Sequence, residues 1–444
     1  MKQFSFERVD FPTGFVFGTS TSAYQIEGQQ FGSAGISHWD SFAATPGNVH
    51  LAQNGALACD HYHRYAEDLD LVAAAGLDAY RFSTAWSRVM PHGTGQANAA
   101  GLDFYDRLVD AICARDLKPF LTLYHWELPT PLSDRGGWCN SDIVDWFAEF
   151  ADVLLRRIGD RLYATAPINE PWCVAWLSYF LGLHAPGLRD IRAASRALHH
   201  VQIAQTRALD IIRAHGAGRA GVVFNFEYAS AADDNDASRK AARFYDAIFN
   251  RWFLEGSCLG EYPSEALEFI EPYLPVGWQQ DLECSAVPLD WIGINYYTRK
   301  LIAPAVDLPL PAVAERTGGL PQTTMGWEIY PPGLGEFLRR VNATSGGAVP
   351  IYITENGIST DDRVTASGID DGVRIDYIDA HLTEVRAALA DGVPIAGYFV
   401  WSLLDNYEWT LGYSKRFGLV YVDFDTLERT PKHSWYALRE ALID

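Results

Sequence analysis

Cysteines are sparse in this chain, and their spacing matches neither a redox motif nor a zinc motif. The six are Cys59, Cys113, Cys139, Cys173, Cys258 and Cys284, with no CxxC pair and no regular framework among them. Small secreted domains depend on disulfide frameworks, whereas cytosolic proteins keep their thiols reduced. We therefore expect reduced, structural cysteines and a cytoplasmic protein.

Long hydrophobic runs and an excess of positive charge are also missing. No stretch approaches the roughly 20 apolar residues that span a bilayer. The N-terminus, "MKQFSFERVDFPTGFVFG", has no apolar signal segment. Acidic residues number 56 against 35 Lys and Arg, which gives a formal net charge of −21 at pH 7. Such a field repels nucleic acid and anionic lipid, so we expect neither nucleic acid nor membrane as a partner.

The chain also lacks the linker segments that separate the domains of a multidomain protein. No Ser/Gly-rich linker or low-complexity tract interrupts its 444 residues, which predicts one domain over residues 1–444. No Gly-rich turn follows the first apolar segment, which argues against a doubly wound sheet that binds a dinucleotide.

What the sequence does contain is a regular alternation of short apolar segments and amphipathic stretches. Eight segments have the composition of buried strands: "GFVFGTS", "DAYRFSTAW", "KPFLTLYHW", "ATAPINEP", "AGVVFNFEY", "DWIGINYYT", "PIYITENG" and "PIAGYFVWS". Helical spacing of apolar residues appears between them, over 61–77, 101–117, 141–160 and 372–392. Strands that alternate with helices pair in parallel, and eight such units close into a (β/α)8 TIM barrel.

Such a barrel takes roughly 250 residues. The remainder is expected in long connections, over 25–60, 171–193, 256–288 and 298–348. Connections that follow strands lie at the carboxyl ends of the strands, where we expect them to wall a deep pocket.

The predicted carboxyl ends of the strands are polar or aromatic, as expected of an active-site face. They carry Gln25, Glu27, Arg81, His125, Trp126, Asn169, Glu170, Asn225, Asn295, Tyr297, Glu355 and Trp401. No lysine stands at such an end, which argues against Schiff-base chemistry. His61 and His63 are two apart on a helix and face different ways, so we expect no metal site.

Two of these residues are carboxylates on different strands. Glu355 closes the run "VPIYITENG"; taken alone, it suits a surface carboxylate at the end of a strand. Glu170 follows the fourth strand, and its side chain can meet that of Glu355 across the barrel mouth. Acetal hydrolysis requires such a pair, because one carboxyl protonates the departing oxygen while the other attacks the anomeric carbon or activates water. Nearby Arg81 and Tyr297 favour Glu355 as the ionised nucleophile and Glu170 as the protonated acid.

Seven motifs together resemble glycoside hydrolase family 1, the β-glucosidase-like enzymes. They are "FVFGTSTSAYQIEG", "RFSTAWSRVMP", "LYHWELP", "INEP", "GINYYT", "YITENG" and "FVWSLLDNYEWTLGYSKRFGLVYVD", in order from Phe11 to about His433. The resemblance implies a retaining double displacement with no cofactor. Glu355 of TENG would be the nucleophile, and Glu170 of NEP would be the acid and then the base.

The resemblance also implies how a sugar is held. Asn169 would contact the 2-hydroxyl, and Gln25, His125 and Glu408 the other hydroxyls. Trp401 would cover the apolar face of the sugar, and the Trp409 indole would donate to a further hydroxyl. Arg81, Asn295 and Tyr297 would orient the carboxylates, and Trp327 would support the leaving group. Trp126 and Phe417 complete the expected substrate-binding set. The residues before NEP ("AP") and the serines of the first motif depart from the usual family pattern without touching this chemistry.

The sequence favours an unphosphorylated sugar. Relatives that hydrolyse 6-phosphorylated glycosides carry a serine, a lysine and a tyrosine where this chain has Glu408, Lys415 and Phe417. A carboxylate repels phosphate but accepts sugar hydroxyls. We expect small-molecule β-glycosides as ligands: terminal β-D-glucosyl residues of β-glucosides and cello-oligosaccharides, with β-galactosides and β-fucosides as side substrates.

Two rival functions remain, a 6-phospho-β-glucosidase and a catalytically silent sugar-binding protein. Silent relatives usually lack one of the two glutamates, and both are present here. Trp172 and Leu177, just beyond the acid, predict a narrowed leaving-group side and tolerance of glucose. The sequence does not determine the natural aglycone or whether the chain forms a homo-oligomer.

Overall fold

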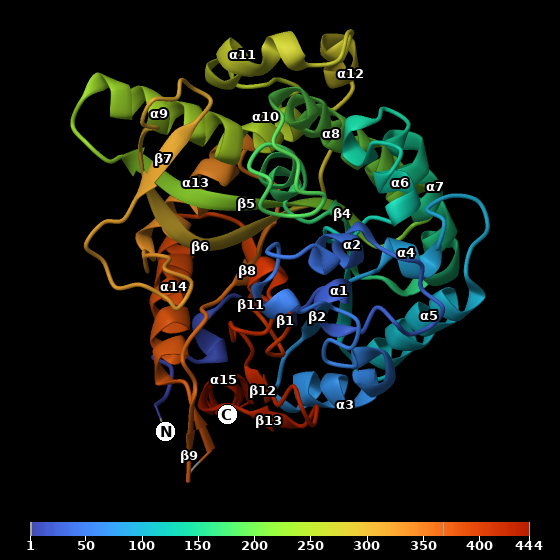
Figure 1. Ribbon diagram of the computed structural model, residues 1–444. Helices are drawn as coiled ribbons and strands as arrows, with labels where there is room; N and C mark the ends of the chain where they lie inside the picture. Colours follow the sequence, from blue (N-terminus) through green and yellow to red (C-terminus); the bar gives the residue numbers. More distant parts are fainter. Residues whose placement is uncertain (1, 367, 444) are drawn as a thin grey trace.

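The computed structural model describes residues 2–366 and 368–443, and its centre is a closed barrel of eight parallel strands (Figure 1). Around the barrel the strands follow the order β5-β4-β3-β2-β1-β11-β8-β6, and pairing of β5 with β6 closes it. Their bounds are β1 (Val16–Ser20), β2 (Ala79–Ser83), β3 (Lys118–Tyr124), β4 (Ala164–Ile168), β5 (Arg219–Ala231), β6 (Trp291–Pro304), β8 (Ile351–Asn356) and β11 (Ile395–Trp401). The predicted TIM barrel and its eight strands are confirmed.

Helices follow the strands and cover the outside of the barrel (Figure 1). The principal ones are α3 (His61–Ala74), α5 (Ala99–Cys113), α7 (Ile143–Ile158), α8 (Ile191–Ala214), α9 (Asp236–Asp246), α10 (Trp252–Cys258), α13 (Pro332–Thr344), α14 (Gly372–Ala390) and α15 (His433–Ile443). Each helix that was predicted from apolar spacing is present. In α3, for example, Leu69 and Val72 are fully buried against the barrel.

The hydrophobic core has two layers, one between the strands and the helices and one inside the barrel. Large aromatic side chains such as Phe120, Trp291 and Phe399 fill the barrel interior. Glycines on neighbouring strands make room for them: a Cβ added at Gly18 would lie 2.4 Å from the Phe399 ring, and one at Gly221 would lie 2.4 Å from Trp291. Because the inside is packed solid, the open space of the barrel lies at its mouth.

Shorter elements complete the described chain. They are η1 (Arg8–Asp10), α1 (Ala23–Ile26), α2 (His38–Ala44), η2 (His50–Ala52), α4 (Trp86–Val89), α6 (Thr130–Ser133), η3 (Gly137–Cys139), η4 (Gly159–Arg161), η5 (Cys173–Leu177), η6 (Ala247–Arg251), α11 (Ser264–Ile270), η7 (Glu271–Tyr273), α12 (Trp278–Glu283), β7 (Val313–Arg316), β9 (Arg363–Thr365), β10 (Gly368–Asp370), η8 (Trp409–Leu411), β12 (Val420–Val422) and β13 (Arg429–Pro431). Of these, η5 and η6 are π-helical turns, a geometry often found at functional sites.

The expectation about the long connections was half right. Segments 171–193 and 298–348 do contribute to the pocket wall, but 25–60 and 256–288 do not. The latter carries α11 and α12, which pack outside the barrel, α11 against α9 and α12 against α8 (Figure 1). Segment 25–60 packs behind the wall, where the Trp39 ring lies 4.7 Å from that of Trp409. The apolar surface against which a long connection packs depends on the tertiary structure, so the sequence does not show which connections form the pocket wall.

Strands β5 and β6 run further than the sequence predicted. Their pairing continues past the barrel to Ala231 and Ile302, and β7 pairs antiparallel with the end of β6. The projecting sheet, visible beside α9 and α13 in Figure 1, adds a wall to one side of the mouth.

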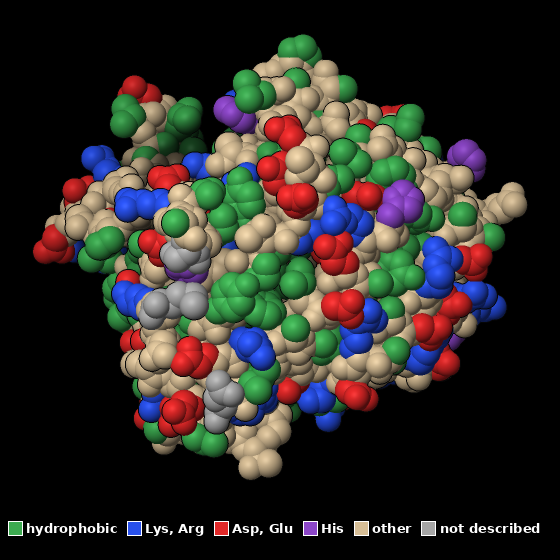
Figure 2. All heavy atoms as spheres, turned by 90° about the horizontal axis from the view of Figure 1, so that it is seen from below, with side chains coloured by type: hydrophobic (Ala, Val, Ile, Leu, Met, Phe, Trp, Pro, Cys, Tyr) green, Lys and Arg blue, Asp and Glu red, His purple; other side chains and the backbone are tan. Residues whose placement is uncertain are grey.

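The surface is mixed in charge. Figure 2 shows acidic and basic side chains interspersed over the face seen from below. Within residues 2–366 and 368–443, no helix combines the length and apolarity needed to cross a membrane.

Candidate active site

A pocket of about 340 Å³ opens at the carboxyl ends of the barrel strands. This is the size of a small-molecule site. Most of the predicted site residues line it: His125, Trp126, Glu170, Tyr297, Trp327, Glu355, Trp401, Glu408, Trp409 and Phe417. Residues from strands far apart in the sequence therefore meet in one cavity.

The two glutamates share this cavity but have different partners. Glu355, within β8, accepts hydrogen bonds from Arg81 Nη1 at 2.6 Å and from the Tyr297 hydroxyl at 2.7 Å. Glu170, in the turn after β4, accepts from Asn295 Nδ2 at 2.7 Å and from the Cys173 thiol at 3.2 Å. A full positive charge faces Glu355, whereas neutral groups hold Glu170.

A polar frame lies directly behind the carboxylates. Arg81, Asn169 and Asn295 are fully buried and do not line the cavity. The Asn169 side-chain oxygen accepts from Arg81 Nη2 at 2.6 Å and from Asn295 Nδ2 at 3.1 Å. The same three side chains thus connect the Glu355 and Glu170 positions, so neither carboxylate shifts without disturbing the other.

Burial raises the pKa of both catalytic candidates, and their different surroundings make the two pKa values differ. At Glu170 burial acts together with the charge of Glu355, and the pKa rises to about 8. At Glu355 burial also raises the pKa, but the Arg81 charge and the hydrogen bonds from Arg81 and Tyr297 oppose it. Near neutral pH this arrangement favours a protonated Glu170 beside an ionised Glu355.

Three residues of the pocket wall have left-handed backbone conformations. Their φ angles are +70° at Trp126, +49° at Glu170 and +49° at Trp409. For residues with a Cβ this conformation is strained and persists only where surrounding contacts enforce it. At Trp126 such contacts are present, because its indole donates to the Asn169 carbonyl at 2.9 Å and its own carbonyl accepts from Trp39 Nε1 at 2.9 Å.

Aromatic rings form one side of the inner cavity, by which we mean the part of the pocket next to the two glutamates. The His125 ring stacks between Trp401 and Trp409, with centroid distances of 5.9 and 6.1 Å and interplanar angles of 19° and 15°. Burial and the nearby Arg81 charge lower the pKa of His125 well below its usual value, so the imidazole is neutral. Neutral rings and indole N–H groups suit the C–H faces and hydroxyls of a sugar.

Glu408 brings a third carboxyl to the cavity. Burial and the charge of Glu355 raise its pKa to about 8. Gln25 lies behind it, fully buried and outside the lining, and its amide donates to the Tyr407 carbonyl at 2.8 Å and to Glu408 at 3.5 Å. In this conformation Gln25 supports Glu408, and direct contact of Gln25 with a sugar stays a prediction.

The outer side of the cavity has its own aromatic and polar residues. The Trp327 ring lies 5.6 Å from that of Tyr297 and 6.3 Å from that of Phe417. Trp172 and Leu177 also line this side, and the Trp172 ring lies 4.2 Å from that of Phe249 on η6. Lys415 is engaged elsewhere, because its ammonium donates to the Thr324 carbonyl at 2.5 Å.

Several lining residues were missed by the sequence interpretation. Cys173 was classed only as a structural thiol, although it directly follows the NEP-Trp motif and contacts Glu170. Glu227, Tyr245, Lys300 and Glu315 were not identified, and we call these four the outer wall. They come from the projecting ends of β5 and β6, from α9 and from β7, and no local signal marks those extensions.

Contacts inside the outer wall hold its charges in place. The Tyr245 hydroxyl donates to Glu227, and the Lys300 ammonium lies 2.5 Å from Glu315. Asn225, a predicted strand-end residue, lies two positions before Glu227 and also faces the cavity, as the alternation of a strand requires.

Several residues discussed from the sequence have their contacts away from the cavity. Glu27 is not a site residue: it is buried in an ion pair with Arg88 at 3.0 Å, because the segment after α1 turns away from the mouth. The six cysteines all have free thiols. His61 pairs with Asp68 at 2.7 Å, and nowhere in the described chain do three His, Cys, Asp or Glu side chains gather as a metal site.

Comparison with known proteins gives one consistent result. The sequence profile of glycosyl hydrolase family 1 matches residues 7–443. The chain is 44% identical over 435 residues to β-glucosidase A of Thermotoga maritima, which covers 96% of this chain and 97% of that protein. It is 38% identical to a bifunctional β-D-glucosidase/β-D-fucosidase of Bifidobacterium breve, with 96% and 97% covered.

Among solved structures, a β-glucosidase from Thermotoga maritima in complex with deoxynojirimycin superimposes with a TM-score of 0.94. It is 43% identical and covers 97% of this chain and 98% of that one. The barrel, the paired carboxyls at its mouth and these matches agree: the chain belongs to glycosyl hydrolase family 1.

Proposed function

We propose that this glycoside hydrolase is a retaining β-glucosidase that removes the terminal β-D-glucosyl residue of β-glucosides and cello-oligosaccharides. The observation that carries the proposal is the pair Glu170 and Glu355, buried in one pocket with opposite surroundings. The names of the relatives from Thermotoga maritima and Bifidobacterium breve support the same activity and a β-fucoside side activity.

The reaction takes two steps. In the first, Glu355 Oε attacks the anomeric carbon while Glu170 gives its proton to the leaving oxygen, so the glycosidic bond breaks and a glycosyl–Glu355 ester forms. In the second, the now ionised Glu170 takes a proton from water, whose oxygen displaces Glu355. Two inversions return the β configuration. Arg81 and Tyr297 stabilise the carboxylate of Glu355 as it departs.

Binding of the sugar follows from the aromatic and carboxyl groups of the inner cavity. Trp401 covers the apolar face of the ring, while Glu408, His125 and the Trp409 indole hold hydroxyls, as in the predicted set. The complex of the Thermotoga maritima enzyme with deoxynojirimycin, a sugar-like molecule, supports a ligand of this size and polarity. Trp327, Trp172 and the outer wall face the leaving group.

An unphosphorylated sugar is proposed over a 6-phosphorylated one. Glu408 brings a carboxyl to the inner cavity where a phosphate would need a cation, and Lys415 is hydrogen-bonded to the Thr324 carbonyl instead of being free for phosphate. We further propose cytoplasmic hydrolysis of short oligosaccharides, in keeping with six free thiols, and tolerance of glucose through the narrowing by Trp172 and Leu177.

Azide rescue tests the assignment of roles. Glu355→Gly is expected to lose hydrolysis of nitrophenyl β-D-glucoside and to regain turnover with added azide, giving an α-glucosyl azide. Glu170→Ala with azide is expected to give the β-glucosyl azide instead, because the covalent intermediate still forms. Near-normal hydrolysis by Glu355→Gly would show that the roles are wrongly assigned. A parallel panel with galactoside, fucoside and 6-phosphoglucoside tests the sugar preference.

A further inference from the structure

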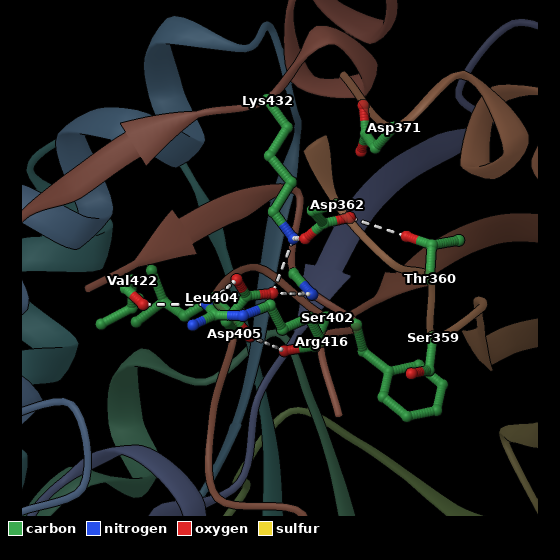
Figure 3. A network of polar contacts seen from close by, with 12 residues as sticks. Ser359, Thr360, Asp362, Asp371, Ser402, Leu404, Asp405, Arg416, Val422 and Lys432 are labelled. Carbon is green, nitrogen blue, oxygen red and sulfur yellow. Dashed lines mark hydrogen bonds and ion pairs between the residues drawn. The ribbon is translucent and has the colours of Figure 1, made fainter. Parts of the chain in front are cut away.

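A cluster of six charged side chains, five of them buried, lies behind the loop that follows β11, and Figure 3 shows part of it. We call them the ion cluster: Asp362, Asp371, Asp405, Arg374, Arg416 and Lys432. All but Arg416 have side chains with almost no solvent exposure, and three acids balance three bases. None of the six lines the pocket.

Asp405 is the centre of the cluster. Its Oδ1 accepts from Lys432 Nζ at 2.6 Å and from the Gly418 backbone N–H at 2.9 Å, and its Oδ2 accepts from Arg416 Nη1 at 2.7 Å. Figure 3 shows the ammonium of Lys432 directed at both Asp405 and Asp362, and the latter ion pair measures 2.6 Å. Because Arg416 and Gly418 flank Phe417, one carboxylate holds the chain on both sides of a residue of the pocket wall.

Arg374, from the first turn of α14, holds the same short segment through its backbone. Its guanidinium donates to the Phe417 carbonyl at 2.9 Å and to the Arg416 carbonyl at 3.2 Å. Asp371 in turn accepts from Arg374 Nε at 2.9 Å. Burial alone would raise the pKa of Asp362, but the charges of Lys432 and Arg374 lower it below its usual value.

The other side of Asp405 leads directly to the sugar-binding part of the cavity. Asn406, the next residue, accepts from the Gln25 amide at 3.0 Å, and the same amide reaches the Tyr407 carbonyl and Glu408. Glu408 is thus three residues from a carboxylate whose position is fixed by two cations and a backbone N–H. Asn406 and Tyr407, which join the two carboxyls along the chain, are both buried.

We propose that the ion cluster positions Glu408 and Phe417 and thereby sets how strongly the enzyme selects a sugar that has its 6-hydroxyl. This inference rests on the proposed function, in which Glu408 accepts sugar hydroxyls. The 6-hydroxyl is chosen because Glu408 stands where relatives that hydrolyse 6-phosphorylated glycosides carry a serine. Buried ion pairs are costly to desolvate and favour one geometry over all others, which suits a device that fixes two loops relative to each other. A hydrogen bond to substrate discriminates only when the protein group is held within a narrow range of positions.

The test compares two substrates that differ only in the 6-hydroxyl, nitrophenyl β-D-glucoside and nitrophenyl 6-deoxy-β-D-glucoside. The measured quantity is the ratio of their kcat/KM values. Asp405→Asn keeps the shape of the side chain but removes its charge, and the ratio is expected to fall about tenfold. Arg416→Gln removes a partner at the exposed edge of the cluster, where loss of charge is tolerated, and the ratio is expected to fall about threefold.

Two controls separate positioning from general stability. Arg416→Lys keeps the positive charge and is expected to restore most of the ratio. Asp78→Asn removes a carboxylate that pairs with Arg8 at 2.9 Å and caps the Phe17 N–H at 2.9 Å, at the opposite end of the barrel from the mouth. It is expected to lower the melting temperature while leaving the ratio within about twofold of wild type.

The outcomes are distinct. If both cluster variants are folded by circular dichroism but lose activity equally on the two substrates, the cluster is only structural and the proposal is wrong. If Asp405→Asn does not fold, the substrate ratios of Arg416→Gln and Arg416→Lys test the proposal without it. A wild-type enzyme that cleaves both substrates equally well would overturn the proposal while leaving the β-glucosidase function intact, and a wild type that cleaves neither would overturn the proposed function itself.

Discussion

The inner and outer halves of the pocket are built in different ways. In the inner half, Glu355 near the end of β8 and His125 just after β3 face the cavity, and the buried frame of Arg81, Asn169 and Asn295 holds the two glutamates from behind. In the outer half, the walls come from strands that overrun the barrel and from π-helical turns, and the Lys300–Glu315 pair is partly exposed. Chemistry requires preorganised charges, whereas a leaving group of variable shape needs only a compatible surface.

The largest effect is expected from the inner half, in Glu355→Gln. The amide keeps the shape of the side chain but cannot form the covalent ester, so kcat on nitrophenyl β-D-glucoside is expected to fall more than about 10³-fold. Steady-state kinetics with careful exclusion of contaminating enzyme measure the loss. Glu27→Gln offers a poor control because Glu27 is itself in a buried ion pair, so Asp78→Asn serves instead.

Glu170→Gln is expected to show a loss that depends on the leaving group. Without a proton donor, hydrolysis of cellobiose should fall by about 10²–10⁴-fold. A dinitrophenyl glucoside, whose leaving group needs no proton, should retain much faster formation of the glycosyl-enzyme and show a burst. Equal losses on both substrates would contradict the role of Glu170 as general acid.

A variant of the outer wall is expected to change the choice of leaving group and little else. Lys300→Met removes the ammonium between Glu315 and Glu227, so kcat/KM for cellobiose should fall about five- to tenfold, in line with one lost charge-assisted contact. On nitrophenyl β-D-glucoside the change should stay within about twofold. A uniform loss on both would place Lys300 in the framework of the inner half and would break the distinction between the two halves.

The smallest effect is expected from Cys173, which lies where the two halves meet. Its thiol donates to Glu170, and this contact lowers the pKa of that carboxyl, which burial and Glu355 have raised to about 8. In the proposed mechanism activity requires protonated Glu170 and so falls as the pH rises through this pKa. In Cys173→Ala the basic limb of kcat/KM should therefore move to higher pH, whereas Cys173→Ser should leave it near wild type. A shift to lower pH in the alanine variant would be the contrary result.

The two glutamates of the inner half could be predicted because each stands at a strand end or just after one. Glu355 and Asn356-Gly357 mark the end of β8 in the sequence itself, and the NEP motif marks the turn after β4. The outer half could not be predicted, because no sequence signal near Lys300 or Glu315 indicates that β6 continues to Pro304 and pairs with β7. The prediction that Glu27 lies at the active-site face was wrong for a related reason. Glu27 does follow the first strand, but its side chain is directed away from the mouth by the ion pair with Arg88.

By itself the sequence determined the eight barrel strands, the four helices α3, α5, α7 and α14, and most of the polar and aromatic residues of the inner cavity. Periodicity and local turn signals encode these features within a few residues of each position. Only the tertiary structure decided which loops wall the pocket, that Gln25 supports Glu408 from behind, and that the six charges of the ion cluster gather behind Phe417. These features depend on contacts between segments hundreds of residues apart, such as Gln25 with Asn406 or Arg429 with Asp68, and the free energy of such contacts exists only once the chain has closed its barrel.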